Sequence, residues 1–250
     1  MKLNKIEKLI LCLSIVLPTF LALPVPANAM HIMEGYLPLG YCIVWGAVCV
    51  PFLAMGVIRL RQTVNESRRS LILLAMSGAF IFVISSLKIP SVTGSCSHMT
   101  GTGLAAILFG VSSTSILGII VLIFQAILLA HGGLTSLGAN TFSMAIAGPI
   151  FAILLFKAGK KLKINRTANV FIAAALGDFI TYCITSIQLA LAYPSETGGV
   201  AASIVKFLGV FAPTQLPLAI VEGLLTALIV IGMERFASRE LSDISFTEAK

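Results

Sequence analysis

The stretch "LILLAMSGAFIFVISSL" at residues 71–87 decides the class of fold, because it is an apolar run without a charged side chain. A run of this length is enough to cross the hydrocarbon core of a bilayer as a helix. The whole chain has 58% hydrophobic and 11% charged residues, with a mean hydropathy of +1.01. A soluble domain of 250 residues cannot bury so much apolar surface, so we predict an all-α membrane protein.

Hydropathy predicts about seven transmembrane helices. The expected spans are Gly40–Ile58, Leu71–Leu87, Gly103–Val111, Ile116–Leu129, Phe142–Phe156, Ala168–Leu191 and Leu216–Met233. The third span is too short for a full crossing of about 20 residues, and "SSTS" at residues 112–115 separates it from the fourth. Either the loop before the third span descends into the protein, or the pair is re-entrant. The Gly/Ser/Thr-rich stretch 91–103 is therefore expected to be a buried functional loop.

Residues 1–29 have the layout of a cleavable signal peptide. Three lysines precede the apolar run Leu9–Leu23, two prolines follow it, and residues 27–29 form the small-x-small triplet "ANA". Cleavage after Ala29 would leave a polytopic membrane domain of residues 30–250 that begins with Met30. The alternative is an uncleaved first transmembrane helix. Removing three lysines and one glutamate from 17 basic and 10 acidic residues leaves 14 and 9, a net charge of +5.

The basic residues predict the orientation in the membrane. Twelve of them lie in two loops and the C-terminal tail: Arg59, Arg61, Arg68, Arg69, Lys157, Lys160, Lys161, Lys163, Arg166, Arg235, Arg239 and Lys250. Seven crossings put all twelve on one side and only Lys88 and Lys206 on the other. Since the positive side is cytoplasmic, we expect a multi-pass plasma (inner) membrane protein with a cytoplasmic C-terminus. The mature N-terminus and the loops 88–103, 130–141 and 192–214 would then lie outside. Short basic loops indicate topology rather than a nucleic-acid partner.

The predicted cleavage would create a metal-binding terminus, because it places a free amine directly before His31. The amine has a pKa of about 8 and deprotonates at modest cost. The amine of Met30 and the amide nitrogen of His31 close a five-membered ring on a metal, and that amide with Nδ1 of His31 closes a six-membered ring. One more nitrogen completes a planar site suited to Ni(II) or Cu(II) and attainable by low-spin Co(II).

His98 is the natural fourth ligand, because it lies in the flexible loop predicted on the same side of the membrane. A histidine in such a loop, taken alone, is more often an interfacial residue with satisfied hydrogen bonds than a metal ligand. His131 has two interpretations: it could support a metal ligand, or it could be the end of a helix capped by Gly132 and Gly133. Asn140 belongs to the same loop and leaves the same two alternatives open.

Two acidic residues fall inside predicted spans. Asp178 shares one helix face with Thr181, Thr185 and Gln188, and Glu222 lies in the last span. Intramembrane acids are costly and mark functional candidates, but a polar clamp between helices is the alternative that we favour. A proton-coupled mechanism would need these acids, whereas an ATP-driven one would not.

Four motifs give the sequence a resemblance to a known family: "MHIMEGYLP", "LKIPSVTGSCSHMTGTGL", "LLAHGGLTSLGANTFSMAIAGP" and "AALGDFITYCITSIQLALAYPS". They resemble the substrate-binding membrane (S) component of energy-coupling-factor (ECF) cobalt transporters, the CbiM/NikM family, and most of all its cobalt branch. The resemblance runs from Met30 to about Glu234. It implies the S-component fold and a metal held by Met30, His31 and His98.

The resemblance also implies partners: a transmembrane coupling protein, cytoplasmic ATPase subunits and a small accessory membrane protein. The chain has no nucleotide-binding loop of its own, so ATP hydrolysis would belong to those partners. We expect no cofactor and no catalytic residue, with Co(II) as the transported ligand for cobalamin synthesis and Ni(II) as the alternative cargo. An intramembrane protease or acyltransferase using His98 with Asp178 or Glu222 is the alternative class, but the chain lacks HExxH and GxSxG motifs.

Overall fold

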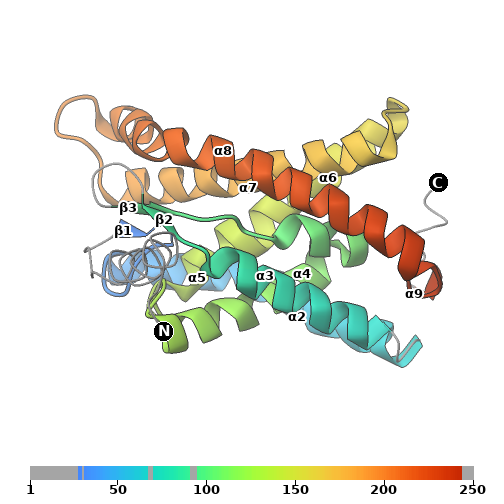
Figure 1. The fold of residues 1–250 in the computed structure, drawn as a ribbon. Coiled ribbons are helices and arrows are strands. Elements are labelled where there is room, and N and C mark those ends of the chain that lie inside the picture. The colour runs from blue at the N-terminus through green and yellow to red at the C-terminus, as the bar shows by residue number, and fades with distance from the viewer. Residues whose placement is uncertain (1–27, 30, 67–69, 91–94, 244–250) are drawn as a thin grey trace, which may run out of the picture.

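The computed structural model describes residues 28–29, 31–66, 70–90 and 95–243 (Figure 1). Its elements are β1 (Asn28–Ala29), α2 (Leu39–Glu66), α3 (Ser70–Ser86), β2 (Ile89–Pro90), β3 (Ser95–Ser97), α4 (Thr102–Leu129), α5 (Leu137–Asn140), η2 (Thr141–Ala147), α6 (Gly148–Lys161), α7 (Arg166–Ala192), α8 (Gly199–Phe236) and α9 (Ser238–Asp243). The prediction of a helical membrane protein is confirmed, with three short strands added at one end of the helices.

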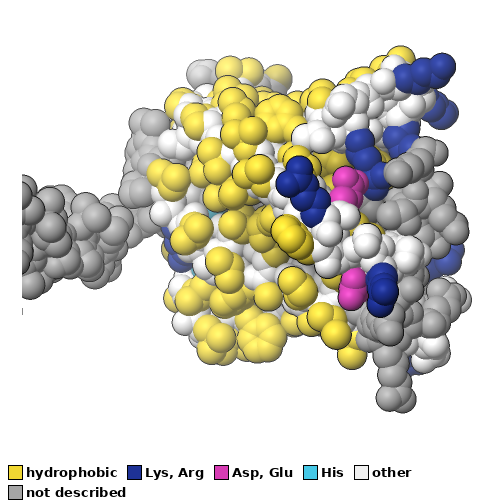
Figure 2. Space-filling view, turned by 45° about the vertical axis from the view of Figure 1, so that its right-hand side comes forward, with side chains coloured by type: hydrophobic (Ala, Val, Ile, Leu, Met, Phe, Trp, Pro, Cys, Tyr) yellow, Lys and Arg dark blue, Asp and Glu magenta, His cyan; other side chains and the backbone are white. Residues whose placement is uncertain are grey.

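The long helices have the length and composition of membrane spans. Within the part of the chain that the structure describes, five helical stretches qualify by length and hydropathy: Leu39–Asn65, Thr102–Leu129, Leu137–Lys161, Arg166–Ala192 and Gly199–Phe236. The apolar helix α3 has 17 residues and is slightly shorter than these five stretches. In Figure 2, hydrophobic side chains cover the middle of the molecule, and the Lys and Arg side chains gather at one end. This surface matches a multi-pass membrane protein, because the apolar band can face lipid while the charged end stays in water.

Gly110 breaks α4 into two helical halves. Its φ of 80° and ψ of 169° lie in a region that is essentially restricted to glycine. The sequence placed this break at residues 112–115, and that detail was wrong, because those residues belong to the second helical half. A single glycine can change the direction of the chain here, whereas the serines and the threonine keep helical backbone.

The first half of α4 runs from the interior toward the basic end of the molecule. Gly103 lies beside Glu222 in the middle of α8, since a Cβ added to Gly103 would be 3.6 Å from Oε1 of that side chain. Leu108 belongs to an apolar cluster with Val230, two turns further along α8. The loop before this half therefore enters the protein, which is one of the two alternatives predicted for the short third span.

The second half of α4 returns in the opposite direction. Its first turn packs on α2, because a Cβ added to Gly56 would lie within 2.4 Å of the Ser112 carbonyl oxygen. Near its other end, Gln125 donates a hydrogen bond from Nε2 to Oγ of Ser85 at 2.7 Å, in the last turn of α3. The predicted compact pair of spans is thus one broken helix whose halves run antiparallel.

Three predicted loops are shorter in the structure. The outer loop expected at residues 192–214 ends at Gly198, because α8 begins at Gly199 and continues for 38 residues through Pro213 and Pro217. At 1.5 Å per residue, α8 is about 57 Å long, well beyond a bilayer core of about 30 Å. α2 continues past the predicted end of its span at Ile58 to Glu66, which shortens the basic loop that follows. α5 begins at Leu137, inside the loop expected at residues 130–141.

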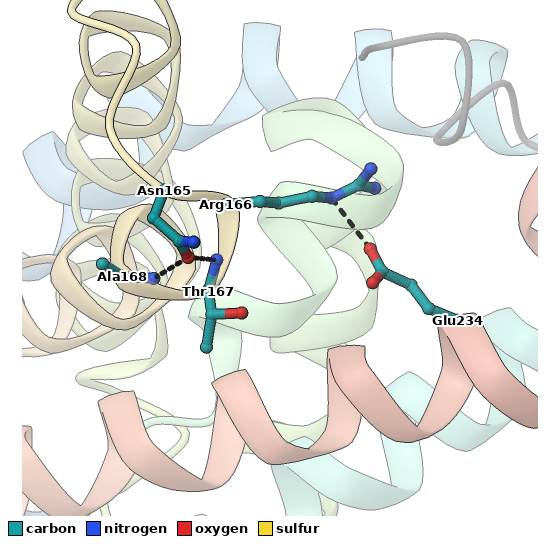
Figure 3. A network of polar contacts seen from close by, with 5 residues as sticks. All are labelled: Asn165, Arg166, Thr167, Ala168 and Glu234. Carbon is teal, nitrogen blue, oxygen red and sulfur yellow. Dashed lines mark hydrogen bonds and ion pairs between the residues drawn. The ribbon is translucent and has the colours of Figure 1, made fainter.

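The basic end of the molecule is held by a helix cap and an ion pair (Figure 3). Oδ1 of Asn165 accepts hydrogen bonds from the backbone N–H groups of Thr167 at 3.0 Å and Ala168 at 3.4 Å, which caps the start of α7. Nε of Arg166 lies 2.8 Å from Oε1 of Glu234, near the end of α8. The start of α7 and the end of α8 are therefore tied together at the end where the cations gather.

Candidate metal site

Three histidine side chains meet at the end of the molecule opposite the basic loops. The ring centroid of His31 lies 4.5 Å from that of His98 and 4.5 Å from that of His131, and the latter two are 4.9 Å apart. One potential ligand atom from each ring lies within 4.8 Å of the other two. All three side chains are buried, with at most 2% of their surface exposed. Such spacing is suited to three nitrogens around one metal ion.

A small sheet brings the first two histidines together. β1 pairs in parallel with β3, with Ala29 opposite Cys96, and β2 pairs with β3 on its other side. His31 and His98 each come two residues after the Ala29–Cys96 pair in the sequence. Met30, the third predicted ligand, lies outside the described residues. β1 consists of the last two residues of the predicted signal peptide, so a cleaved chain must hold His31 by other contacts.

Those contacts come from the residue that follows His31. The backbone N–H of Ile32 donates to Oδ1 of Asn140 at 2.9 Å, and its carbonyl oxygen accepts from Nδ2 of the same amide at 3.0 Å. The hydroxyl of Ser136 also donates to the Ile32 carbonyl. The side-chain amide of Asn140 therefore makes the two backbone hydrogen bonds that a neighbouring β-strand would make. It holds the N-terminal segment independently of β1.

The loop after α4 closes over the same segment. The carboxylate of Glu34 accepts hydrogen bonds from the backbone N–H groups of Leu134 and Thr135, and Gly35 N–H donates to the Thr135 hydroxyl at 3.1 Å. Hydrogen bonding by Thr135 lowers the pKa of Glu34 below its ordinary value. The two loops approach so closely that a Cβ on Gly133 would lie 2.5 Å from the Cα of Glu34.

One ring nitrogen donates to the protein, and most of the others are placed as potential ligands. Nδ1 of His98 lies 2.8 Å from the Met99 carbonyl oxygen, so Nδ1 carries the proton and Nε2 keeps its lone pair. Nε2 of His31 lies 3.2 Å from Sδ of Met144. Within the described residues, no hydrogen-bond partner is found for Nδ1 of His31, Nε2 of His98 or either nitrogen of His131. Nδ1 of His31 is also the nitrogen that the predicted chelate requires.

Burial keeps all three imidazoles neutral at pH 7. Desolvation is the largest cause in each case, and it lowers the pKa of His98 to about 4. It lowers the pKa of His31 and of His131 well below the ordinary value of 6.5 as well, and the neighbouring histidines add to the effect. A neutral imidazole presents a lone pair, which is the form that binds a metal.

The structure gives different results for the other predicted residues. His131 joins the cluster rather than only ending a helix, although α4 does end beside it, at Leu129. Asn140 does not face the cluster as a donor but holds Ile32. Sequence reasoning missed Met144 and Ser136, because a thioether in a helix and a serine in a loop carry no pattern that distinguishes them.

The two intramembrane acids reach the loop that carries His98. The Thr100 backbone N–H donates to Oε2 of Glu222 at 2.6 Å and to Oδ1 of Asp178 at 3.2 Å. Thr181 and Thr185 on the same face of α7 donate instead to carbonyl oxygens of their own helix. The acids therefore do more than clamp two helices together, because both are bonded to the buried loop.

Comparison with known proteins agrees with this arrangement. The family model described as "Cobalt uptake substrate-specific transmembrane region" (CbiM) matches residues 31–240. The chain belongs to this family. It is 63% identical over 241 residues to the "Cobalt transport protein CbiM" of Lachnoclostridium phytofermentans, which covers 96% of each chain. It is 59% identical over 206 residues to the protein of the same name from Clostridioides difficile, which covers 82% of each chain.

Solved structures show the same fold. A structure titled "Crystal Structure of an transition metal transporter" is 30% identical, with a TM-score of 0.70, and the match covers 82% of this chain and 92% of the other. A truncated transition metal transporter gives a TM-score of 0.71 at 28% identity, with 82% and 98% covered. The family identifies the chain as a component of a cobalt uptake transporter and not as an enzyme.

Proposed function

We propose that this chain captures Co(II) at the outer face of the plasma membrane and delivers it inward as part of an ATP-driven ECF importer. The observation that carries the proposal is the cluster of three buried imidazoles with ring centroids 4.5 to 4.9 Å apart. The relatives named as cobalt transport proteins support Co(II) as the cargo. The metal would then supply cobalamin synthesis.

In the proposed site, the ion is held by four nitrogens: the amine of Met30, the amide nitrogen and Nδ1 of His31, and Nε2 of His98. The bonds from Asn140 to Ile32 keep His31 beside His98 after the signal peptide is removed. Burial lowers the pKa of the imidazoles, so at neutral pH protons do not compete with the metal ion for their lone pairs. His131 lies beside this set and contacts both other rings.

The proposed energy source is ATP hydrolysis in partner subunits. The described helices leave only short connections at the basic end, such as residues 162–165 between α6 and α7. A connection of this size cannot hold a nucleotide-binding domain but could orient a membrane coupling protein. The proposed orientation has this end in the cytoplasm and the mature N-terminus outside, as the cations favour.

The proposal is tested at the amino terminus. A variant with one residue inserted between Ala29 and Met30, with the signal cleavage point kept, moves the free amine out of the chelate. Titration with Co(II) should show loss of tight binding, with the circular dichroism spectrum unchanged. The His98→Ala variant should weaken binding by an order of magnitude or more. Unchanged affinity in the extended variant would contradict the proposed chelate.

Nickel is the second candidate cargo, because nitrogen sites bind Ni(II) more tightly than Co(II) in the Irving–Williams order. Competition between labelled cobalt and nickel in vesicles that contain the complete complex separates the two. The same vesicles test the energy source: with ATP inside and no proton gradient, cobalt should accumulate. Accumulation only under an imposed gradient would instead point to Asp178 and Glu222 as proton carriers.

A further inference from the structure

A network of three polar side chains lies beneath the loop that carries His98. Asp178 comes from α7, and Gln215 and Glu222 come from α8. All three are almost completely buried, with exposed fractions of 1%, 0% and 0%. Groups of this kind are costly at membrane depth, so each should be explained by what it contacts.

The contacts converge on two positions of the loop, His98 and Thr100. Nε2 of Gln215 donates to the backbone carbonyl oxygen of His98 at 3.2 Å and to Oδ2 of Asp178 at 2.6 Å. The hydroxyl of Thr100 donates to Oε1 of Glu222 at 2.9 Å, in addition to the Thr100 N–H bond to the same carboxyl group. Side chains of α7 and α8 therefore hold the backbone of residues 98–100 by hydrogen bonds.

These hydrogen bonds affect the direction of the His98 ring. The only hydrogen bond found for that ring among the described residues joins Nδ1 to the next carbonyl oxygen, which belongs to the same loop. In the described part of the chain the ring thus has no direct hydrogen bond to a helix, and its direction depends on its own backbone and on its contacts with the rings of His31 and His131. The carbonyl group of His98 accepts a hydrogen bond from Gln215, so the amide of Gln215 holds the backbone from which the ring extends.

We propose that Gln215, held in place by Asp178, is a positioning residue that sets His98 for metal binding, and that Glu222 fixes the loop at Thr100. The proposal rests on the proposed function, in which His98 is a ligand. It gives the two intramembrane acids a task in cargo binding that involves no proton transport. It also explains why a glutamine and two acids are buried where α7 and α8 face this loop.

The test compares two buried glutamines of the same kind. Gln125 in α4 is also fully buried and donates one hydrogen bond, from Nε2 to Oγ of Ser85. Gln215→Met and Gln125→Met each remove a buried amide and keep the length of the side chain. Both should lower the thermal midpoint, whereas only Gln215→Met should weaken Co(II) binding, by about 10- to 100-fold, as changes around metal ligands often do. The visible absorption of bound Co(II) should shift in Gln215→Met toward the spectrum of His98→Ala.

A double variant shows whether Gln215 acts through His98. If it does, adding Gln215→Met to His98→Ala should not weaken Co(II) binding further, because the ligand being positioned is already absent. Additive losses, or equal affinities in Gln215→Met and Gln125→Met, would overturn the inference. If His98→Ala leaves the affinity unchanged, the proposed ligand set fails instead, which is a separate result.

A second pair of variants covers the case in which Gln215→Met does not fold. Thr100→Val removes the hydroxyl bonded to Glu222 and keeps the shape of the side chain. Thr185→Val is the matched control, because that buried hydroxyl donates to a carbonyl oxygen of its own helix. Thr100→Val should weaken Co(II) binding several-fold more than Thr185→Val does. Equal affinity in the two variants would contradict the role given to Glu222.

Discussion

The substitution Asn140→Ala should weaken cobalt binding without removing a metal ligand. Asn140 is buried, with 2% of its surface exposed, and its amide makes two hydrogen bonds to the backbone of Ile32. After truncation, the Ile32 carbonyl oxygen still accepts a hydrogen bond from Ser136, but the Ile32 N–H loses the partner described for it. The predicted effect therefore comes from one buried donor left without an acceptor.

The magnitude follows from that single donor. An unsatisfied buried N–H costs about 1 to 3 kcal/mol. Because the N-terminal segment would be held less firmly in the variant, this cost should appear in metal binding and raise the Kd for Co(II) by about 5- to 150-fold, at 1.4 kcal/mol for each factor of ten. Binding is measured by isothermal titration on purified protein whose amino terminus has been confirmed by sequencing.

The control is Asn169→Ala. Asn169 is equally buried, with 2% exposed, and its Nδ2 donates to the Phe156 carbonyl oxygen at 2.8 Å, near the basic end of the molecule. This change should lower thermal stability while leaving the Kd for Co(II) within about twofold of the original, because distant sites act independently. A Kd in Asn140→Ala that matches the control would refute the role assigned to the Asn140–Ile32 bonds.

Three further predictions concern the ring cluster and the break in α4. His131→Ala should weaken Co(II) binding less than His98→Ala in parallel titrations, because the proposed chelate does not use His131; a larger effect would reverse the assignment. Burial lowers the pKa of His98 from 6.5 to about 4, so the unfolded chain binds more protons between these values. The free energy of unfolding of the metal-free protein should therefore fall as pH drops from 6.5 to 5, by about 1.6 kcal/mol from His98 alone, because the unfolded imidazole is already half protonated at pH 6.5. Thermal melts of the original chain and His98→Gln at both pH values measure this, and an equal pH dependence would contradict it. Finally, Gly110→Ala should destabilise the protein by about 1 to 3 kcal/mol because of its φ of 80°. Gly232→Ala, with open space around the added methyl group, is the control and should be close to neutral in the same melts.

Patterns that depend on neighbouring residues in the sequence predicted much of this molecule. The apolar runs gave the positions of the long helices, and the short third span gave the descending loop. His31 was identified from its position after a cleavage motif, and His98 from the flexible loop around it. In each case the relevant chemistry is local, because hydrophobic length and chelate-ring size are read from adjacent residues.

Features that depend on distant contacts were missed or misplaced. The outer part of α8 was predicted to be a loop, because Pro213 and Pro217 interrupt the helical sequence pattern. The helix continues through both prolines. The break in α4 was placed at serines rather than at Gly110, because sequence alone does not show which residue adopts a positive φ. The bond from Gln215 to the His98 carbonyl oxygen joins positions 117 residues apart and has no signature in the sequence.

The account depends most on which atoms surround the bound metal. X-ray absorption at the cobalt edge, measured on purified protein loaded with one equivalent of Co(II), reports those atoms directly. The account predicts four nitrogen neighbours and outer-ring scattering from the imidazoles of His31 and His98, with the His98 contribution lost in His98→Ala. Sulfur neighbours, a missing imidazole contribution, or a spectrum unchanged in His98→Ala would contradict it.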